Sequence, residues 1–549
     1  MKLIPLCLAL LSCVRNIDSY KILVFNSAVY NSHSQFLGNI ADTLTEAGHD
    51  VTSLSPIIDP RVKHGTEKSK KIIIQQSEET EKIMKGFGVI RAGYFMNNIL
   101  DPTGVYHYRW LLASHFISQC RTVLNETQLI DNLRNEKFDV MIVMNFDMCG
   151  VALSHLLQPR SLINSVNAYP NSYMFEEFGI PLALSYNPSS FIPDHDVHSM
   201  WSRIRNIYAN IMVHFHFYPR RILVEELFRE KFGADFPSLE VHRSFALFVI
   251  FSDAIHEISS HAAYTLTNSE LLIDYAAPTL NRIVPIGGIG AKPPKALDES
   301  WNAVLAKRSK TILISFGSKV RGVDLPPAFK QSIATVIGRF PDITFIWKYE
   351  EPEDAFSKET RASLPNLHFS TWLPQNDLLN DDRVAAFVTH GGIGSSIELA
   401  LRGKPGIFVP IFGDQPRNAG MMEHNGLGKV LDKFDLADPD KVEAAIREVL
   451  TDTRYAENAR RASAMLARKP FTPQQLLIKT VEFAAEFGPS KALRPQSYEM
   501  SAIEYHNIDI LICATVFLVL LAYIAVRTSK CIVCRLITAA SINAKKKSE

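Results

Sequence analysis

The strongest structural constraint in this sequence is a short apolar run that ends at a group of glycines. The run covers residues 384–389 (VAAFVT) and stops at residues 390–392 (HGG). A run of this length is typical of a buried strand, and the glycines predict a tight turn into a helix that begins near Ser395. Gly403 ends this helix, and residues 406–409 form a second buried strand. Strand, turn, helix and strand in this order predict an α/β domain with a parallel sheet.

The turn after this strand is a candidate phosphate site, formed by His390, Gly392 and Ser395. Glycines let a backbone approach a ligand closely, and the free amides at the start of a helix favour an anion. Asp414 and Gln415 follow the second strand, at the edge where a doubly wound sheet holds its ligands. A glycine-rich turn taken alone is weak evidence, because most such turns only reverse the chain.

The N-terminal part of the chain repeats this pattern. Residues 20–26 (YKILVFN) predict a first strand, residues 50–54 a second one, and Phe36 and Ile40 mark the buried face of the helix between them. His33 lies at the turn from strand to helix, where such a fold places its chemistry. An imidazole there can accept a proton from an acceptor hydroxyl near neutral pH. By itself, a histidine before a helix is more often a capping or surface residue.

Length and charge narrow the function. A chain of 549 residues predicts more than one domain, and its 58 Lys and Arg balance 57 Asp and Glu. A net charge of +1 argues against a nucleic-acid partner. His214 and His216 alternate with phenylalanines, but no third ligand accompanies them, so we predict no metal site.

Both ends of the chain predict membrane targeting. Residues 1–19 begin with one lysine and a short apolar stretch, which is typical of a secretory signal peptide. Residues 510–526 are uncharged and have the minimum length of a membrane-spanning helix, although a buried core helix is the alternative. Arg527, Lys530 and Arg535 follow, and the positive-inside rule assigns them to the cytoplasm. We therefore expect a single-pass protein whose bulk is lumenal.

Three smaller signals concern the same compartment. Lys546 and Lys547 resemble a dilysine retrieval signal, which predicts the endoplasmic reticulum membrane. The alternative is a basic tail that reflects only the positive-inside rule. Once the predicted signal peptide, the span and the tail are set aside, Cys120 and Cys149 remain, so one disulfide is possible. A single glycosylation sequon begins at Asn125, which predicts a glycoprotein.

The array from WLPQ at residues 372–375 through HGG to residues 414–415 resembles the signature of the UDP-glycosyltransferases. The similarity is to their membrane-bound animal branch, which includes the UDP-glucuronosyltransferases, and it extends over residues 21–527. It implies the GT-B fold, in which two Rossmann-like, doubly wound domains face each other across a cleft. The implied segments are a signal peptide (1–19), an acceptor domain (20–290), a linker (291–300), a UDP-sugar domain (301–487), a juxtamembrane segment (488–508), a transmembrane helix (509–527) and a cytoplasmic basic tail (528–549).

The resemblance also implies a role for each matching residue. His33 is the implied catalytic base. The implied UDP-binding residues are Trp372 and Gln375 for the uracil, Glu398 for the ribose, and Ser318, His390, Gly392 and Ser395 for the diphosphate. Asp414 and Gln415 are the implied sugar-binding pair.

This chain departs from the family pattern at one catalytic position. Relatives carry an acid, the partner of the catalytic histidine, where this chain has Met144. Asp147 is the nearest acid, and we expect it to take that role. An imidazolium without a carboxylate lacks its stabilising partner. A catalytically impaired UDP-sugar-binding regulatory partner of active family members is therefore the alternative function.

A second departure concerns the donor. Members that use glucuronate carry an arginine where this chain has Asn268. A sugar carboxylate gains from a charged, bidentate partner. Asn268 is therefore a predicted sugar-binding residue that favours UDP-glucose or another neutral donor.

The function that the resemblance implies is an inverting, metal-independent transfer of a glucosyl or glucuronosyl group. The donor is a UDP-sugar, no cofactor is required, and the acceptor is a hydroxyl group of a small lipophilic molecule in the lumen of the endoplasmic reticulum. The resemblance also implies detoxification as the role and allows homo- or hetero-oligomers with family members.

Overall fold

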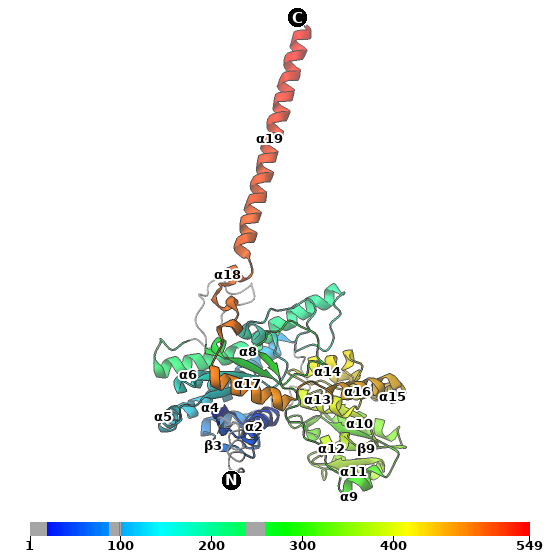
Figure 1. Ribbon diagram of the computed structural model, residues 1–549. Helices are drawn as coiled ribbons and strands as arrows, with labels where there is room; N and C mark the ends of the chain where they lie inside the picture. The colour runs from blue at the N-terminus through cyan, green and yellow to red at the C-terminus, as the bar shows by residue number, and fades with distance from the viewer. Residues whose placement is uncertain (1–18, 87–97, 99, 238–257, 549) are drawn as a thin grey trace, which may run out of the picture. The chain divides into compact units, whose positions relative to one another are not determined.

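The computed structural model describes residues 19–86, 98, 100–237 and 258–548 (Figure 1). Apart from Ser19, the predicted signal peptide lies outside the described residues. The chain forms two compact units, the first made of Met1–Glu240 with Glu257–Arg494 and the second of Val241–His256 with Pro495–Glu549. The first unit contains two parallel sheets, as the α/β prediction requires.

The first sheet has the strand order β3-β2-β1-β4-β5-β6-β7, and every neighbouring pair is parallel. Ile22 of β1 pairs with Val51 on one side and Val140 on the other, so the chain turns outward in both directions from the centre. This is the doubly wound order. The strands are β1 (Lys21–Phe25), β2 (Asp50–Pro56), β3 (Lys70–Ile74), β4 (Val140–Met144), β5 (Ser161–Val166), β6 (Tyr264–Thr267) and β7 (Ile283–Pro285).

Helices cover both faces of this sheet, which explains why its strands are continuously apolar. On β4, Ile142 and Met144 face the core beneath α2, whereas Met141 and Val143 face the opposite core. A disulfide between Cys120 and Cys149 joins α4 to α6. The helices of this part are α2 (Asn31–Glu46), α4 (Pro102–Asn125), α5 (Thr127–Asn135), α6 (Met148–Leu157), α7 (Ser172–Phe178), α8 (Met200–Phe232) and η1 (Ile258–His261).

The second sheet repeats the doubly wound order as β10-β9-β8-β11-β12-β13, again with parallel pairs. Its strands are β8 (Lys310–Ser315), β9 (Ile343–Lys348), β10 (Leu367–Ser370), β11 (Val384–Thr389), β12 (Gly406–Phe408) and β13 (Gly428–Val430). Its helices are α9 (Glu299–Leu305), η2 (Gly322–Asp324), α10 (Pro327–Gly338), α11 (Ala355–Ser363), α12 (Gln375–Leu379), α13 (Ile393–Arg402), α14 (Gln415–His424), η3 (Lys433–Ala437), α15 (Pro439–Thr451) and α16 (Thr453–Leu466).

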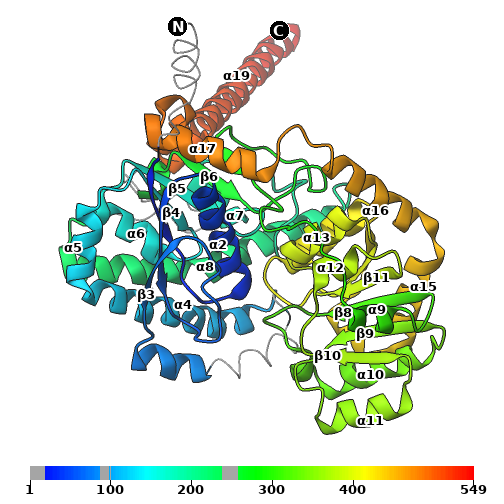
Figure 2. The same cartoon turned by 60° about the horizontal axis from the view of Figure 1, so that its bottom comes forward.

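Helix α17 (Pro473–Phe487) belongs by its packing to the first sheet, beside α2 (Figure 2). Leu477, Val481 and Ala484 lie in the same buried cluster as the residues of β1 and α2. The Ser161 hydroxyl donates a hydrogen bond to the carbonyl of Ala484 at 2.7 Å. The sequence-based boundary at residue 487 therefore extends the second domain too far. The apolar side chains on one face of α17 are buried against the first domain, although α17 follows the second domain in the chain.

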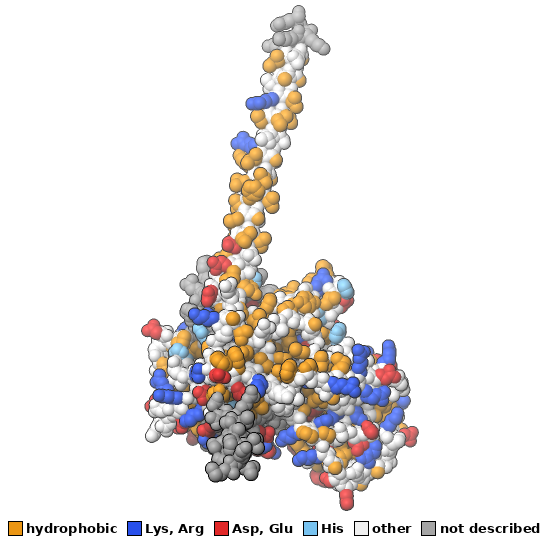
Figure 3. All heavy atoms as spheres, viewed as in Figure 1, with side chains coloured by type: hydrophobic (Ala, Val, Ile, Leu, Met, Phe, Trp, Pro, Cys, Tyr) orange, Lys and Arg blue, Asp and Glu red, His pale blue; other side chains and the backbone are white. Residues whose placement is uncertain are grey.

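The second unit contains the C-terminal helix α19 (Ile508–Ser548), preceded by η5 (Gln496–Glu499) and α18 (Ala502–Tyr505), while η4 (Lys491–Leu493) ends the first unit. Within α19, Ile508–Ala544 is long and apolar enough to cross a membrane, and its side chains are exposed. Apolar side chains dominate its surface, with basic ones farther along (Figure 3). The helix continues beyond the predicted apolar stretch, because Arg527 and Lys530 carry long side chains that a helix accommodates readily.

Candidate active site

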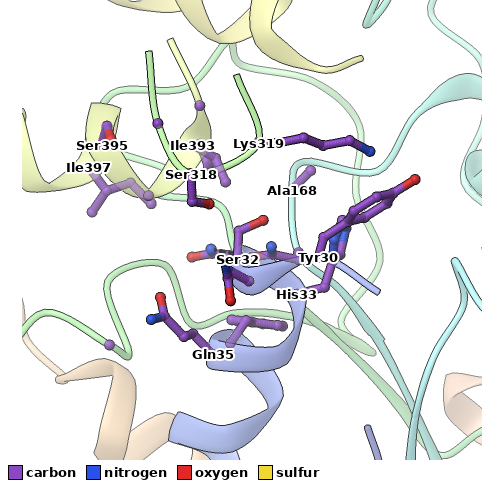
Figure 4. Close-up of a pocket in the computed structure, with 18 of the residues that line it drawn as sticks. Tyr30, Ser32, His33, Gln35, Ala168, Ser318, Lys319, Ile393, Ser395 and Ile397 are labelled. Carbon is purple, nitrogen blue, oxygen red and sulfur yellow. Dashed lines mark hydrogen bonds between the residues drawn. The ribbon is translucent and has the colours of Figure 1, made fainter. Parts of the chain in front are cut away.

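A cavity of about 1060 Å³ lies between the two sheets of the first unit, and both domains line it. The ends of β1, β8 and β11 lead into its lining, as expected for the carboxyl edge of parallel sheets. Eleven of the predicted site residues are among the lining residues: His33, Asn268, Ser318, Trp372, Gln375, His390, Gly392, Ser395, Glu398, Asp414 and Gln415. Figure 4 shows His33, Ser318 and Ser395 facing this common space from three different segments.

The predicted phosphate turn is built around the buried ring of His390. A Cβ atom at Gly317 would lie 2.6 Å from this ring, and one at Gly392 would lie 2.7 Å from it, so both turns need glycine. Gly392 caps α13 without a side-chain hydrogen bond, which leaves the first amides of the helix for a ligand. Burial, with Lys348 adding to it, lowers the pKa of His390 to about 4. The ring is therefore neutral at neutral pH and can hydrogen-bond a diphosphate.

The residues predicted for uracil and ribose are joined to one another. The Gln375 side chain donates hydrogen bonds to Glu398 at 2.6 Å and to the Ser395 hydroxyl at 3.1 Å. Burial raises the pKa of Glu398, and the Gln375 bond opposes that shift. Trp372 remains 69% exposed, so its indole face is accessible for stacking. This end of the cavity therefore combines a stacking surface with a fixed acid.

The residues predicted for the sugar shape the loop before α14. The Gln415 side-chain oxygen accepts hydrogen bonds from the backbone amides of Ile411 at 2.9 Å and Phe412 at 3.1 Å. Asp414 accepts one from the side chain of Asn418 at 2.7 Å, and burial raises the pKa of its carboxyl. The position of the sugar pair is thus set by the folded loop.

His33 lies in the first turn of α2, enclosed by aromatic rings. Its imidazole stacks on Phe146 with a centroid distance of 5.0 Å and lies 5.2 Å from the ring of Tyr30. Its Nδ1 atom is buried and has no hydrogen-bond partner among the described residues. Burial lowers the pKa of His33 to about 3, and the positive charges of Lys319 and Arg220 contribute. This histidine is neutral throughout the physiological range.

The prediction that Asp147 partners His33 is wrong. Asp147 caps α6 and accepts a hydrogen bond from the amide of Cys149 at 3.0 Å, and it also bonds the hydroxyl of Ser27. It is absent from the residues that line the cavity. Burial raises its pKa to about 6. A helix that starts at residue 148 uses the carboxylate for its free amides, and Phe146 covers the imidazole instead.

Sequence reasoning missed the two cations that flank His33. Lys319 directly follows Ser318 in the turn after β8. Because Ser318 was a predicted site residue, the sequence could have indicated that Lys319 lies near the cavity. Arg220 lies in the middle of the long helix α8, and its local sequence carries no such signal. Only the folding of α8 over the first sheet brings Arg220 to the cavity.

Helix α14, which starts at the sugar pair, is held by the first domain. Arg417 of α14 forms an ion pair with Asp274 at 2.7 Å, and both side chains are at least 98% buried. The guanidinium also lies 3.8 Å from the centre of the Tyr169 ring. A Cβ atom at Gly420 would lie 1.6 Å from the carbonyl oxygen of Pro193, so the two domains pack closely here. These contacts join the two domains close to the predicted sugar-binding pair.

Restoring an acid at position 144 is expected to destabilise the fold without raising the rate of transfer. Met144 is 4% exposed, belongs to the same apolar core as Phe36 and Leu37, and is not among the residues that line the cavity. Met144→Asp would bury a carboxyl group there and cost about 3 kcal/mol of unfolding free energy or more. Met144→Leu, which conserves volume, should cost less than about 1.5 kcal/mol. Thermal unfolding of both variants checks this, and a faster Met144→Asp enzyme would contradict it.

Comparison with known proteins gives one family across the chain. The family described as "UDP-glucoronosyl and UDP-glucosyl transferase" matches residues 20–548. The Caenorhabditis elegans protein ugt-48, whose name places it among UDP-glucuronosyltransferases, is 28% identical over 93% of this chain and 94% of its own. Human UDP-glucuronosyltransferase 1A8 is 27% identical over 92% of this chain and 91% of its own.

Solved structures show the same architecture. The UGT2 enzyme of Phytolacca americana, complexed with UDP-2fluoro-glucose and pterostilbene, is 13% identical with a TM-score of 0.54, covering 85% of this chain and all of the other. The calicheamicin glycosyltransferase CalG4 is 15% identical with a TM-score of 0.52, covering 86% of this chain and all of the other. At these identities the likeness concerns the fold alone, and it confirms the GT-B arrangement of two Rossmann-like domains.

Proposed function

The chain belongs to the family of UDP-glucoronosyl and UDP-glucosyl transferases, and from this premise we propose that it transfers a glucosyl or glucuronosyl group to a hydroxyl group of a small lipophilic acceptor. The donor is a UDP-sugar. The observation that carries the proposal is the convergence of eleven predicted residues, distant in sequence, on one cavity between the two domains.

The proposed reaction is a single displacement. The acceptor oxygen forms a bond to the anomeric carbon, and the bond from that carbon to the diphosphate breaks, with the electron pair leaving on UDP. One displacement inverts the anomeric configuration. His33 takes the acceptor proton, while His390, Ser318 and the first amides of α13 receive the charge that develops on the leaving diphosphate. Fixed donors at that position can meet the charge without a metal ion.

The proposal for the donor is a neutral hexose. Asn268 is buried at the cavity wall and donates a hydrogen bond to Asn167 at 2.8 Å. We expect UDP-glucose to exceed UDP-glucuronate in kcat/KM. Asn268→Arg should shift the ratio toward UDP-glucuronate by about tenfold or more, because a guanidinium can bind a carboxylate bidentately. Steady-state kinetics with both donors measures the ratio, with Asn268→Gln as the uncharged control, and a wild-type preference for UDP-glucuronate would refute the assignment.

For localisation we propose the endoplasmic reticulum membrane, with the catalytic unit in the lumen. The apolar helix followed by Arg527, Lys530 and Arg535 supports a cytoplasmic tail. The disulfide between Cys120 and Cys149 supports an oxidising compartment for the catalytic unit. Sensitivity of the Asn125 sequon to endoglycosidase H, together with protease protection in intact microsomes, tests this topology.

The enzymatic proposal is tested by acceptor-dependent release of UDP from the membrane-embedded protein. UDP-glucose, UDP-glucuronate, UDP-galactose and UDP-N-acetylglucosamine are offered with a pooled panel of phenols and hydroxylated lipophiles. Trp372→Ala is expected to weaken UDP binding, because it removes the exposed stacking surface. UDP binding without turnover of any acceptor would favour the alternative of a regulatory partner.

The rate of transfer to hydroxyl acceptors is expected to stay nearly constant down to about pH 5. The pKa of His33 is lowered to about 3, so the base remains deprotonated until the pH approaches that value. An imidazole with its ordinary pKa of about 6.5 would lose activity progressively below that pH. Profiles of kcat/KM against pH decide between the lowered and the ordinary pKa of His33, provided that the acceptor does not titrate in this range. A loss centred near the ordinary value would contradict the buried environment of His33.

A further inference from the structure

The linker between the two domains is fastened to α12, beside the residue predicted for uracil. Arg402, the last residue of α13, donates hydrogen bonds to the Asn376 side-chain oxygen, from Nη2 at 2.7 Å and from Nε at 3.0 Å. Its Nη2 atom also donates to the backbone carbonyl of Lys292 at 2.9 Å, and the Asn376 side-chain amide reaches the same carbonyl at 3.1 Å. We call this closed set of contacts, formed by Arg402, Asn376 and the Lys292 carbonyl, the linker clasp.

The clasp is built into the wall of the cavity. Lys292 and Asn376 line the cavity, whereas Arg402 is not among the lining residues in the described part of the chain. Asn376 directly follows Gln375, whose side chain donates a hydrogen bond to Glu398 at 2.6 Å. Arg402 therefore reaches the predicted nucleoside residues through Asn376 and the linker, without touching the space that a ligand would occupy.

The backbone that enters the linker is confined from both sides. A Cβ atom at Gly288 would lie 3.5 Å from Ile397 of α13, and one at Gly290 would lie 2.3 Å from the side chain of Asn39 on α2. Gly288 has a φ of +85°, which side chains rarely adopt. Figure 4 shows Ile397 and Gln35 of α2 on opposite sides of this space. The linker thus enters the clasp along a closely defined path.

Arg402 also acts on Glu398 through its charge. Burial raises the pKa of Glu398, and the nearby charge of Asp377 adds to that effect. The hydrogen bond from Gln375 and the positive charge of Arg402 oppose it. An ionised carboxylate can accept hydrogen bonds from both ribose hydroxyls, whereas a protonated one loses part of that capacity. The guanidinium therefore supports the predicted ribose residue as well as the linker.

Resting on the proposed binding of a UDP-sugar, we propose that the interdomain linker is part of the uridine site and that Arg402 is the residue that positions it. The clasp holds Asn376 against the Lys292 carbonyl, and this fixes the start of α12 so that Gln375 stays bonded to Glu398. Two N–H groups in one plane meet the Asn376 oxygen, and the ammonium group of a lysine lacks this geometry. The predicted diphosphate residues lie in other turns, so the clasp acts on the nucleoside half of the donor.

Binding and kinetics of the full-length chain test this role. Arg402→Met should weaken the binding of UMP and of UDP by the same factor of about tenfold, because both ligands contain the uridine that the clasp serves. With UDP-glucose as donor, KM should rise by a similar factor while kcat stays within about twofold. Arg402→Lys keeps the charge near Glu398 but loses the planar donor pair, so its affinities should lie between those of the wild-type protein and Arg402→Met. It also carries the test if Arg402→Met does not fold.

A double-mutant cycle tests whether Arg402 acts through Asn376. Asn376→Ala combined with Arg402→Met should bind UMP no more than about twofold more weakly than the weaker single variant. Arg383→Met is the matched control, because this arginine also bonds an asparagine oxygen, that of Asn302 at 2.7 Å, and does not line the cavity of the described residues. Its UMP affinity should match the wild-type value.

Three results would overturn the inference and leave the proposed transferase intact. They are unchanged UMP affinity in both Arg402 variants, a loss for UDP that far exceeds the loss for UMP, and fully additive losses in the cycle. A wild-type protein that binds neither UMP nor UDP would instead overturn the proposed function itself.

Discussion

Replacement of His33 by alanine is expected to lower kcat for hydroxyl acceptors by about 10²- to 10⁴-fold, the usual contribution of a general base. His33 lies in the predicted catalytic turn and lines the cavity, and its Nδ1 atom is buried without a hydrogen-bond partner among the described residues. Removal of the ring leaves an acceptor hydroxyl without a proton acceptor. The binding of UDP should change little, because the predicted nucleotide residues belong to the second domain.

Single-turnover kinetics with an alcohol acceptor, combined with calorimetric measurement of UDP affinity, separates these two effects. His198→Ala provides a matched control, since this histidine is exposed and absent from the cavity lining. If His33→Ala kept the wild-type rate with alcohol acceptors, His33 would not be the general base.

Breaking the buried ion pair between the domains should cause the largest loss of stability. In the wild-type protein, the Arg417 guanidinium lies 2.7 Å from the Asp274 carboxylate. Asp274→Ala removes this carboxylate and leaves the guanidinium buried without its partner. Removal of one partner of a buried pair costs about 3–5 kcal/mol, because the remaining charge is uncompensated. Since Arg417 lies two residues after Gln415, we also expect weaker binding of the donor sugar.

Thermal or denaturant unfolding of the purified full-length protein checks this prediction. The double variant Asp274→Ala, Arg417→Met removes both charges and should recover part of the lost stability. Asp435→Ala breaks an exposed pair with Lys441 and serves as the control, with an expected cost below about 1 kcal/mol. Equal losses at Asp274 and Asp435 would show that burial does not govern the contribution of this interdomain pair.

Local sequence determined the elements of both domains. The apolar run at residues 384–389 coincides with β11, and the glycine turn after it opens α13, as the pattern predicted. Strands β1 and β2 also begin within one residue of their predicted starts. Strand length, glycine turns and helix starts depend on neighbours in the chain, so a sequence pattern contains the necessary information. The order of these elements predicted parallel α/β domains, and the resemblance to a known family implied that two doubly wound domains face each other.

Pairings between distant residues were decided only by the tertiary structure. Asp147 is the acid nearest to Met144 in sequence, yet it caps α6, and Phe146 contacts His33 instead. Helix α17 follows the second domain in the chain but buries its apolar stripe on the first. Which acid, ring or cation reaches His33 depends on how helices from separate segments pack.

The sequence by itself therefore determined the parallel α/β class and the glycine turn after β11, because glycines, apolar runs and their spacing act locally. The roles of the nucleotide-site residues were implied by the resemblance to a family and remain predictions. The tertiary structure alone decided the electrostatic character of the acceptor side. Arg220 and Lys319 come from different domains and meet around His33 only when the cavity forms. A charge acts through space, and its distance to a base is a property of the packed fold.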